Sequence, residues 1–584
     1  MKRLPDTLVV LAAFAAACSS SDGSKSTTPP SSPFANYPSG TPGATTPGAT
    51  TPGQGVSATP GTNPATPGTS NVGGEMGNGP LPLGMMPAPT GTEPGLDPNA
   101  TETSLPRSTP EAQGIASADI LKLVNALDAA VHEIHSFMLL RHGQVLAEGF
   151  WAPYSVDDIQ VLYSGTKSFN STAVGMLVDD GKLSVDDLVL SKFPELAPAQ
   201  PDANMQKMTI KNLLTMATGH TADTIDTLRK APNGEWTKAF LATTVPNVPG
   251  TNFLYNSGAA YVLGAIVQKT SGQTVDEFLT PRLFEPLGIQ RHLWGKSPEG
   301  VNLTDGGLSV RTEDFAKFGF LYLQHGSWGG QQLVSEQWVT DATSKEIANG
   351  QDNGNWSYGY GYQFWRSPIG FRADGSLGQY SFVLPDQDIV IAITSGTSNS
   401  GGTDTLMKTV FANVPAVQPA ALAEDAGSLQ ALKDKLASLS LALPTGADSS
   451  AMAAQVSGAH YTVASNAQGI TGLSFDFNAA PPIVTIEDGD GPHAIPVGIG
   501  SWERARTGFK KHINELYDTP EQGVAARGAW SADDTFNARM VLTETPYTVI
   551  TNFKFTGNQV ALDVAYNIRW DVNHMTEPQV VGTR

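Results

Sequence analysis

Ser164 and Lys167 are the residues of this chain whose types and spacing point most directly to catalysis. Side chains three positions apart are neighbours on one face of a helix. A serine hydroxyl becomes a nucleophile when a nearby base removes its proton, and a lysine amine is such a base while it is neutral. The pair therefore predicts acyl transfer through a serine. An isolated S-x-x-K is also found as a surface hydroxyl beside a solvated ammonium, so the surrounding elements must decide.

The residues after this pair have the pattern of an amphipathic helix. Phe169, Ala173, Leu177 and Val178 recur at helical spacing, and Gly181 is a suitable residue for the C-terminal cap. The pattern predicts a helix with Ser164 in its first turn. Backbone amides there lack helical partners and the helix dipole favours negative charge, so the Ser164 amide could stabilise an oxyanion.

Several further segments resemble the class C β-lactamase-like serine hydrolases, which include esterases, D-amino-acid amidases and aminohexanoate-dimer hydrolases. They follow the family's order along the chain, at 109–115, 141–154, 209–220, 253–264, 279–289, 306–323 and 378–393. The resemblance covers residues 107–415. It implies a mixed α/β and α+β penicillin-binding-protein/β-lactamase fold, in which an antiparallel sheet flanked by helices is joined to an all-helical lobe.

The resemblance also implies a catalytic tyrosine from a Y-x-N or Y-x-S element, here Tyr255-Asn256-Ser257. Tyr255, as a phenolate or through a proton shared with Lys167, would activate Ser164 and then protonate the leaving group. The alternative for Tyr255 is an aromatic residue packed ahead of a helix. Ser257 stands where lactamase-type members commonly carry asparagine, which favours the esterase and amidase branches.

A third family element is K-T-G or H-T-G on an edge strand, and its counterpart here is Ala-Asp-Gly at 373–375. The basic residue that helps hold a penicillin carboxylate is missing, which makes tight β-lactam recognition less expected. Arg372 or Arg366 is a candidate substitute, and a solvated arginine is the alternative. Gly375 allows close backbone approach, and the Ser376 amide is the expected second oxyanion donor.

Other residues complete the expected site. Tyr360 and Trp365, in an aromatic-rich run that resembles a cleft segment of the family, are candidates for the substrate-pocket wall or for core packing. No cofactor or metal is implied, because six histidines of the hydrolase-like region lack a paired ligand spacing such as H-x-x-x-H: His132, His135, His142, His220, His292 and His325. The expected reaction is hydrolysis of an ester or amide, with a β-lactamase or D,D-peptidase and an inactive binding module as alternatives.

Composition limits the partners. The net charge is −20, with no basic run, which argues against nucleic acid and anionic membrane surfaces as ligands. A small-molecule ester, amide or peptide is the expected substrate. A chain of 584 residues is also too long for one ordinary core, so more than one domain is expected.

The first 106 residues predict export and a tether. Residues 1–18 have a charged start and a short apolar stretch typical of a secretory signal, and Cys18, the single cysteine, ends a run that resembles a bacterial lipoprotein lipobox. Lipidation of Cys18 would anchor the protein to a membrane; ordinary signal cleavage is the alternative. Residues 19–106 are rich in Thr, Pro, Gly and Ser and predict a disordered tether that spans on the order of 50 Å.

The C-terminal region predicts a separate β-rich domain. Residues 416–444 read as a linker with a helix over 429–441, and residues 445–584 show alternating strand patterns at 472–478, 482–488, 539–557 and 558–570. Gly557-Asn558 predicts a hairpin turn. An antiparallel barrel or sandwich is expected there, and the resemblance implies that it is lipocalin-like.

Overall fold

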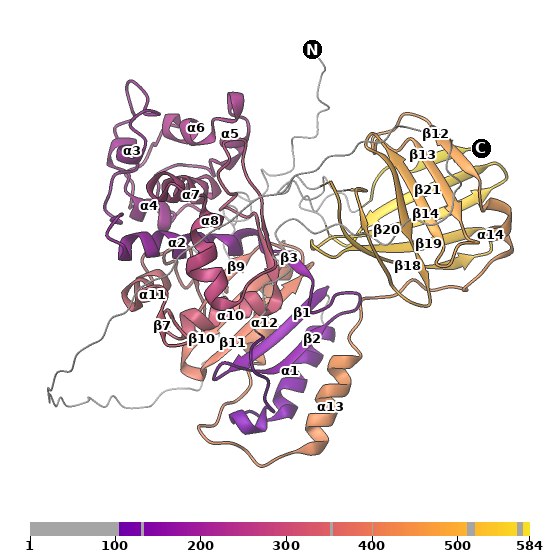
Figure 1. The fold of residues 1–584 in the computed structure, drawn as a ribbon, viewed down its shortest axis with the longest axis horizontal. Helices are drawn as coiled ribbons and strands as arrows, with labels where there is room; N and C mark the ends of the chain where they lie inside the picture. Colours follow the sequence, from indigo (N-terminus) through magenta and orange to yellow (C-terminus); the bar gives the residue numbers. More distant parts are fainter. Residues whose placement is uncertain (1–103, 130–132, 351–353, 400, 511–519, 569–575) are drawn as a thin grey trace, which may run out of the picture. The chain divides into compact units, whose positions relative to one another are not determined.

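The computed structural model describes residues 104–129, 133–350, 354–399, 401–510, 520–568 and 576–584 (Figure 1). The expected signal segment, Cys18 and nearly all of the expected tether lie outside these residues, as does His132. Across the described part of the chain, no helix combines the length and the apolar character needed to cross a bilayer.

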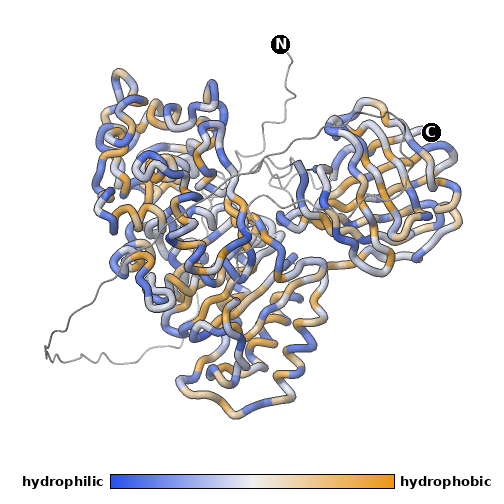
Figure 2. Tube along the Cα trace, viewed as in Figure 1, coloured by the Kyte–Doolittle hydropathy of each residue, from blue (hydrophilic) through white to orange (hydrophobic). Residues whose placement is uncertain are grey.

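A six-stranded sheet forms the centre of the N-terminal part, in the order β2-β1-β11-β10-β9-β8, with every neighbouring pair antiparallel. Its strands are β1 (Ile134–Arg141), β2 (Gln144–Phe150), β8 (Trp365–Arg366), β9 (Phe371–Gly375), β10 (Gln379–Leu384) and β11 (Ile389–Ser395). All residues of β1, β9, β10 and β11 are buried, so both faces of the sheet are covered. These strands are largely hydrophobic in Figure 2.

The two faces of the sheet pack against different helices. Because side chains alternate along a strand, Phe137 and Leu139 of β1 lie in one core and Met138 and Leu140 in another. The first core includes α1 (Ser117–Ala129), α12 (Gly402–Ala412) and α13 (Ala426–Ala437), and the second includes α10 (Thr312–Leu323). Figure 1 shows α1 and α13 lying along one side of the sheet.

The helical lobe is built around α7 (Ser257–Ser271), which contacts most of its other helices (Figure 1). Those helices are α2 (Thr166–Asp179), α3 (Val189–Lys192), α4 (Ile210–Leu214), α5 (Ile225–Arg229), α6 (Trp236–Ala242) and α8 (Val275–Leu279). Further elements of this region are α9 (Glu285–Leu287), α11 (Glu336–Thr343), the small sheet β3 (Ile159–Val161), β5 (Leu308–Arg311) and β4 (His292–Trp294), and the pair β6 (Ser327–Trp328) and β7 (Gln331–Gln332). The sheet and helical lobe expected from the sequence are both present.

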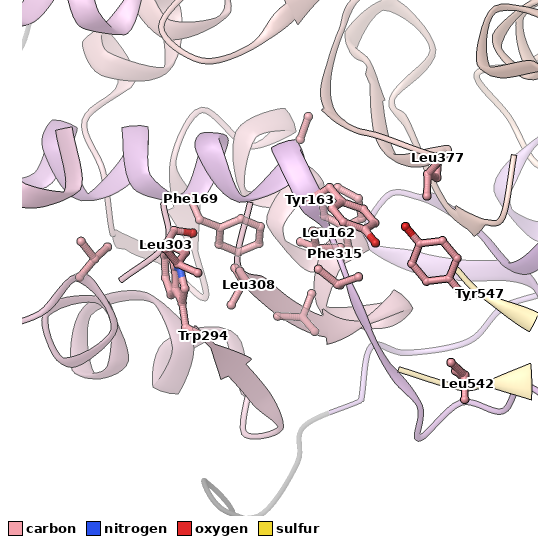
Figure 3. Close-up of a cluster of buried hydrophobic side chains, with 14 of the residues drawn as sticks. Leu162, Tyr163, Phe169, Trp294, Leu303, Leu308, Phe315, Leu377, Leu542 and Tyr547 are labelled. Atoms are coloured by element: carbon pink, nitrogen blue, oxygen red, sulfur yellow. Dashed lines mark hydrogen bonds between the residues drawn. The ribbon is translucent and has the colours of Figure 1, made fainter. Parts of the chain in front are cut away.

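A buried hydrophobic cluster fixes the start of α2. Figure 3 shows Phe169 of α2 beside Leu303 and Leu308, and Leu162 and Tyr163 beside Phe315. The Phe169 ring also stacks on Phe318 of α10, with centroids 3.8 Å apart. These contacts hold the start of α2 against β5 and α10.

The C-terminal part is an eleven-stranded, mostly antiparallel sheet that curls into a nearly closed barrel, where β15 lies against β17. Its strands are β12 (His460–Val463), β13 (Gly472–Asp476), β14 (Ile483–Asp488), β15 (Gly491–Pro496), β16 (Gly498–Ile499), β17 (Glu503–Thr507), β18 (Gln522–Ala532), β19 (Thr535–Leu542), β20 (Thr548–Thr556), β21 (Gln559–Tyr566) and β22 (Val580–Thr583), with α14 (Ala451–Val456) beside them. The predicted antiparallel barrel is confirmed. Aromatic rings pack together in its core, among them Phe475, Phe553 and Phe555.

Three element boundaries differ from the sequence expectations. Ser164 lies in a 3-10 turn, Tyr163–Gly165, directly before α2 rather than within it. The helix expected over 429–441 ends at Ala437, because the chain then runs beside Ala152, whose amide and carbonyl bond to the backbone of Leu439 and Leu441. The single run expected over 539–557 is two strands, β19 and β20. The predicted turn at Gly557 is confirmed, with a φ of 60°.

Candidate active site

Ser164 lies in a short turn that is fixed at both ends by β5. The Leu162 amide donates to the Leu308 carbonyl (2.8 Å), and the Leu308 amide donates to the Thr166 hydroxyl (3.1 Å). Tyr163 takes a positive φ of 46°, which turns the chain sharply before the helix. From residue 159 to residue 177, Ser164 is the one residue that is not buried. The turn therefore presents this hydroxyl and hides its neighbours.

Lys167 lies about one helical turn beyond Ser164, as the spacing predicts. Its Nζ donates to Ser164 Oγ (2.9 Å) and to the Asp305 carbonyl (2.5 Å), and its side chain is fully buried. Burial lowers the pKa of Lys167 to about 8, although the carboxylates of Asp305 and Asp223 oppose this effect. A sizeable fraction of Lys167 is therefore neutral near neutral pH, as a base for Ser164 must be.

Tyr255 meets the same two residues from the loop before α7. Its hydroxyl shares a hydrogen bond with Ser164, and Lys167 Nζ lies 5.0 Å from the centre of its ring. Burial raises the pKa of the Tyr255 hydroxyl well above its usual range. Tyr255 is thus a neutral phenol in the resting protein. Of the two roles left open by the sequence, the shared proton fits this arrangement and the standing phenolate does not.

Tyr360 and Trp365 lie behind Tyr255. The Trp365 ring stacks on Tyr255 (5.8 Å between centroids, 20° between planes), and Tyr360 contacts Tyr255 edge-on at 6.3 Å. Both side chains are buried, with Tyr360 1% and Trp365 9% exposed. The structure therefore gives them a packing position beneath Tyr255, whereas Trp356 and Phe253 of the same cluster are partly exposed.

The end of β9 lies against the nucleophile turn, and Gly375 makes this possible. A Cβ at position 375 would lie 2.0 Å from the Leu162 carbonyl oxygen, so any other residue would push the strand away. Ser376 follows directly and is nearly buried, at 7% exposed. Ser257 is the first residue of α7, and its amide donates to Asp223 Oδ1 (2.8 Å).

The missing basic residue of β9 is not replaced by an available arginine. Arg372 is fully buried, pairs with Asp374 (Nε to Oδ2, 2.6 Å) and lies over the ring of Trp356 at 4.8 Å. Arg366 donates to the Thr343 carbonyl at 2.9 Å. Both arginines are engaged by the fold, and Arg372 is not the solvated residue that the sequence left as an alternative.

Sequence reasoning named Asp374 in the Ala-Asp-Gly element but did not predict that charged groups surround Lys167. Asp374 is one of them, and burial raises the pKa of its carboxyl to about 6 even beside Arg372. Asp305 has no motif around it, and Arg229 lies 3.8 Å from its carboxylate. The alternating spacing of Arg372 and Asp374 on one strand face was the one available signal. Within the described residues, no three His, Cys, Asp or Glu side chains are grouped to hold a metal ion.

Comparisons with known proteins show what this chain is similar to. The family model described as Beta-lactamase matches residues 127–410. The 6-aminohexanoate-dimer hydrolase of Paenarthrobacter ureafaciens is 29% identical over 220 residues, which are 35% of this chain and 55% of that protein. Penicillin-binding protein 4 of Amycolatopsis lactamdurans is 26% identical over 321 residues, 48% of this chain and 81% of that protein. The lovastatin esterase of Penicillium rubens is 29% identical over 189 residues, 29% of this chain and 47% of that protein.

The matched region spans about half the length of the first and third of these relatives. Residues 127–410, which the family model matches, contain the six-stranded sheet, the helical lobe and all three of Ser164, Lys167 and Tyr255. The penicillin-binding-protein/β-lactamase fold expected from the sequence is confirmed, and residues 127–410 of this chain belong to the β-lactamase family.

Proposed function

We propose that this protein is a serine hydrolase that cleaves a carboxylic ester or amide through an acyl-enzyme on Ser164. The observation that carries the proposal is the 2.9 Å contact between the partly exposed Ser164 hydroxyl and the buried Lys167 amine, whose pKa is lowered to about 8. The names of two relatives, an aminohexanoate-dimer hydrolase and an esterase, support the same chemistry.

The proposed reaction follows from the positions of these groups. Neutral Lys167 takes the proton of Ser164 Oγ as the oxygen attacks the substrate carbonyl carbon, and the amides of Ser164 and Ser376 stabilise the oxyanion. Tyr255 gives its proton to the leaving alcohol or amine and receives the Lys167 proton in return. Water then attacks the acyl group and passes a proton to Lys167, and Ser164 Oγ is reprotonated as the acid leaves.

The charge of the pocket favours substrates without a carboxylate beside the reacting carbonyl. Arg372 is neutralised by Asp374, and the carboxylates of Asp223 and Asp305 also act on Lys167. Arg229 lies 3.8 Å from the Asp305 carboxylate, so the described arginines near Lys167 already face carboxylates, and a substrate carboxylate would meet a mainly negative pocket. This charge distribution supports an esterase or amidase. The alternative is a β-lactamase or D,D-peptidase, and the similarity to a penicillin-binding protein is the observation in its favour.

The test is turnover of p-nitrophenyl butyrate and nitrocefin by the full chain, compared with Ser164→Ala and with Ser191→Ala, a control at an exposed serine of α3. Ester turnover lost only in Ser164→Ala, with a trapped acyl group on Ser164 by mass spectrometry, is the expected result. Nitrocefin turnover exceeding ester turnover would move the function to a β-lactamase. No turnover and no labelling of Ser164 would leave a binding module.

The cellular location that we propose is the outer face of a membrane in a bacterium. Its support is the sequence alone: the secretory signal pattern of residues 1–18, the lipobox-like run that ends at Cys18, and the tether composition of 19–106. Fractionation with Cys18→Ala is the test. Release of the variant from membranes supports the anchor, and unchanged membrane association contradicts it.

A further inference from the structure

Asn256, the middle residue of Tyr255-Asn256-Ser257, has a more extensive role than its place in the motif requires. Its side chain is fully buried and serves as the N-terminal cap of α7, where Oδ1 accepts from the Ala259 amide (3.3 Å). A cap alone needs one acceptor. Asn256 uses both ends of its amide, and four further contacts lead to a different part of the chain.

These contacts join α7 to the segment before α5. Asn256 Oδ1 accepts from the amide (3.1 Å) and the hydroxyl (2.8 Å) of Thr224. Its Nδ2 donates to Thr218 Oγ1 (3.3 Å) and to His220 Nδ1 (3.4 Å). All three partners are buried. The Asn256 amide therefore holds the 218–224 segment against the start of the helix.

The surroundings leave this network little freedom. A Cβ at Gly258 would lie 2.1 Å from Thr224 Oγ1, so the absence of a side chain there lets Thr224 reach Asn256. Burial lowers the pKa of His220 to about 4, so its ring is neutral and Nδ1 can accept the Asn256 hydrogen bond. The asparagine amide supplies a donor on one side and an acceptor on the other, which neither aspartate nor an apolar residue would do.

The hydroxyl of Tyr255 shares a hydrogen bond with Ser164, whereas the contacts of its ring have less direction. The ring packs on Trp365 and Tyr360, and these contacts tolerate sliding of the ring in its own plane. The backbone on its C-terminal side is fixed by the Asn256 network, one residue away. A shift of about 1 Å in a reacting group can lower a rate about 100-fold. The position of the Tyr255 hydroxyl thus depends on the residue that follows it.

We propose that Asn256 is the positioning residue that holds the Tyr255 hydroxyl at Ser164, by tying the start of α7 to Thr218, His220 and Thr224. This inference rests on the proposed function, because it assigns Tyr255 the task of protonating the leaving group. Asn256 touches no reacting atom in this scheme and acts through its neighbour alone.

Asn256→Ser is the informative variant. Serine is a good helix cap, so the bond to Ala259 can persist, but its side chain is too short to reach Thr218 and His220. For esters with poor leaving groups, which must be protonated to depart, we expect kcat to fall about 10- to 100-fold. For p-nitrophenyl butyrate, whose leaving group departs unprotonated, the fall should be several-fold smaller, and KM should change little for both.

A double-mutant cycle with Tyr255→Phe separates positioning from general weakening of the fold. If Asn256 acts through Tyr255, adding Asn256→Ser to Tyr255→Phe should cause no further loss. Thr274→Ala, which removes a cap from α8, is the matched control and should lower stability without changing the leaving-group preference. Thr218→Val, nearly the same shape, is the second variant should Asn256→Ser fail to fold, and should show the same preference more weakly.

A crystal structure of the variant gives a readout that does not depend on turnover. A Tyr255 hydroxyl displaced from Ser164 Oγ supports the inference even if the wild-type protein proves inert, in which case the proposed function alone fails. The inference is overturned if Tyr255 keeps its place, if both classes of ester lose activity equally, or if the losses of Asn256→Ser and Tyr255→Phe multiply.

Discussion

The pH dependence of turnover tests the role of Lys167 most directly. Burial lowers the pKa of this amine from 10.5 to about 8. At pH 7 about one Lys167 in ten is then neutral, compared with about one in 3,000 for an unshifted lysine. Burial therefore increases the amount of available base roughly 300-fold at neutral pH, which corresponds to about 3 kcal/mol.

The measurement is kcat/KM for p-nitrophenyl butyrate between pH 5.5 and 9.5, followed at a wavelength that does not depend on nitrophenolate ionisation. Because the base must be deprotonated, kcat/KM should rise about tenfold per pH unit at low pH and level off near pH 8. Ser164→Ala supplies the blank for hydroxide-driven hydrolysis. The Tyr255 hydroxyl, whose pKa is raised, should contribute no step in this range.

Asp305→Asn should shift the rising part of this pH profile, its acidic limb, in a known direction. The Asp305 carboxylate raises the pKa of Lys167, so its removal should shift the limb to lower pH and increase activity at pH 6. Asp186→Asn, at an exposed carboxylate in the loop before α3, is the control and should leave the limb in place. A limb below pH 6.5 in the wild-type protein, or no limb while the protein stays folded, would refute Lys167 as the base.

Three further changes have defined outcomes. Lys167→Met should abolish turnover yet increase the free energy of unfolding at pH 7 by up to about 3 kcal/mol, because the folded state no longer holds a protonated amine whose pKa is depressed. Urea unfolding measures this gain at pH 7. Above pH 10.5 the gain in stability should vanish. Gly375→Ala should lower kcat at least about 10-fold and cost about 1–3 kcal/mol of stability, because the added Cβ would press on the Leu162 carbonyl. Kinetics and thermal unfolding measure the two effects. A variant with wild-type kcat and stability would contradict the close approach of β9 to the nucleophile turn. The pKa of His220 is about 4 in the folded protein and 6.5 in the unfolded chain, so the stability of the wild-type protein should fall as pH drops from about 6.5 to 4. This fall should exceed that of His220→Gln by up to about 3 kcal/mol. Equal acid sensitivity of the wild-type protein and His220→Gln would argue against a neutral buried His220.

The parts of the site that follow from local sequence were predictable. The spacing of Ser164 and Lys167 fixes their contact once a turn of helix forms between them, and Tyr255 was found through its motif. The positive φ of Tyr163 was not predictable, because the bonds from Leu162 and Thr166 to β5 come from a strand about 140 residues away. Local pattern decides which elements form; contacts distant in sequence decide how the nucleophile turn is bent.

The charges around Lys167 and the element ends escaped prediction for the same reason. Asp305 acts on Lys167 through a loop with no motif, and the pairing of Arg372 with Asp374 requires a buried strand face that an apparently polar edge segment did not suggest. In the C-terminal part, the alternating pattern of 539–557 has the correct strand content, but the pattern does not reveal where β19 stops and β20 begins.

The burial pattern around Ser164 has a genetic consequence. Every residue from 159 to 177 except Ser164 is packed in the interior, so substitutions elsewhere in this stretch, Lys167→Met apart, should reduce the amount of folded protein together with its activity. At Ser164 these two effects should separate for most substitutions. In a library that scores abundance and turnover independently, alleles of Ser164 should be present at wild-type level and inactive, and they would supply loss-of-function alleles that keep every interaction surface of the protein.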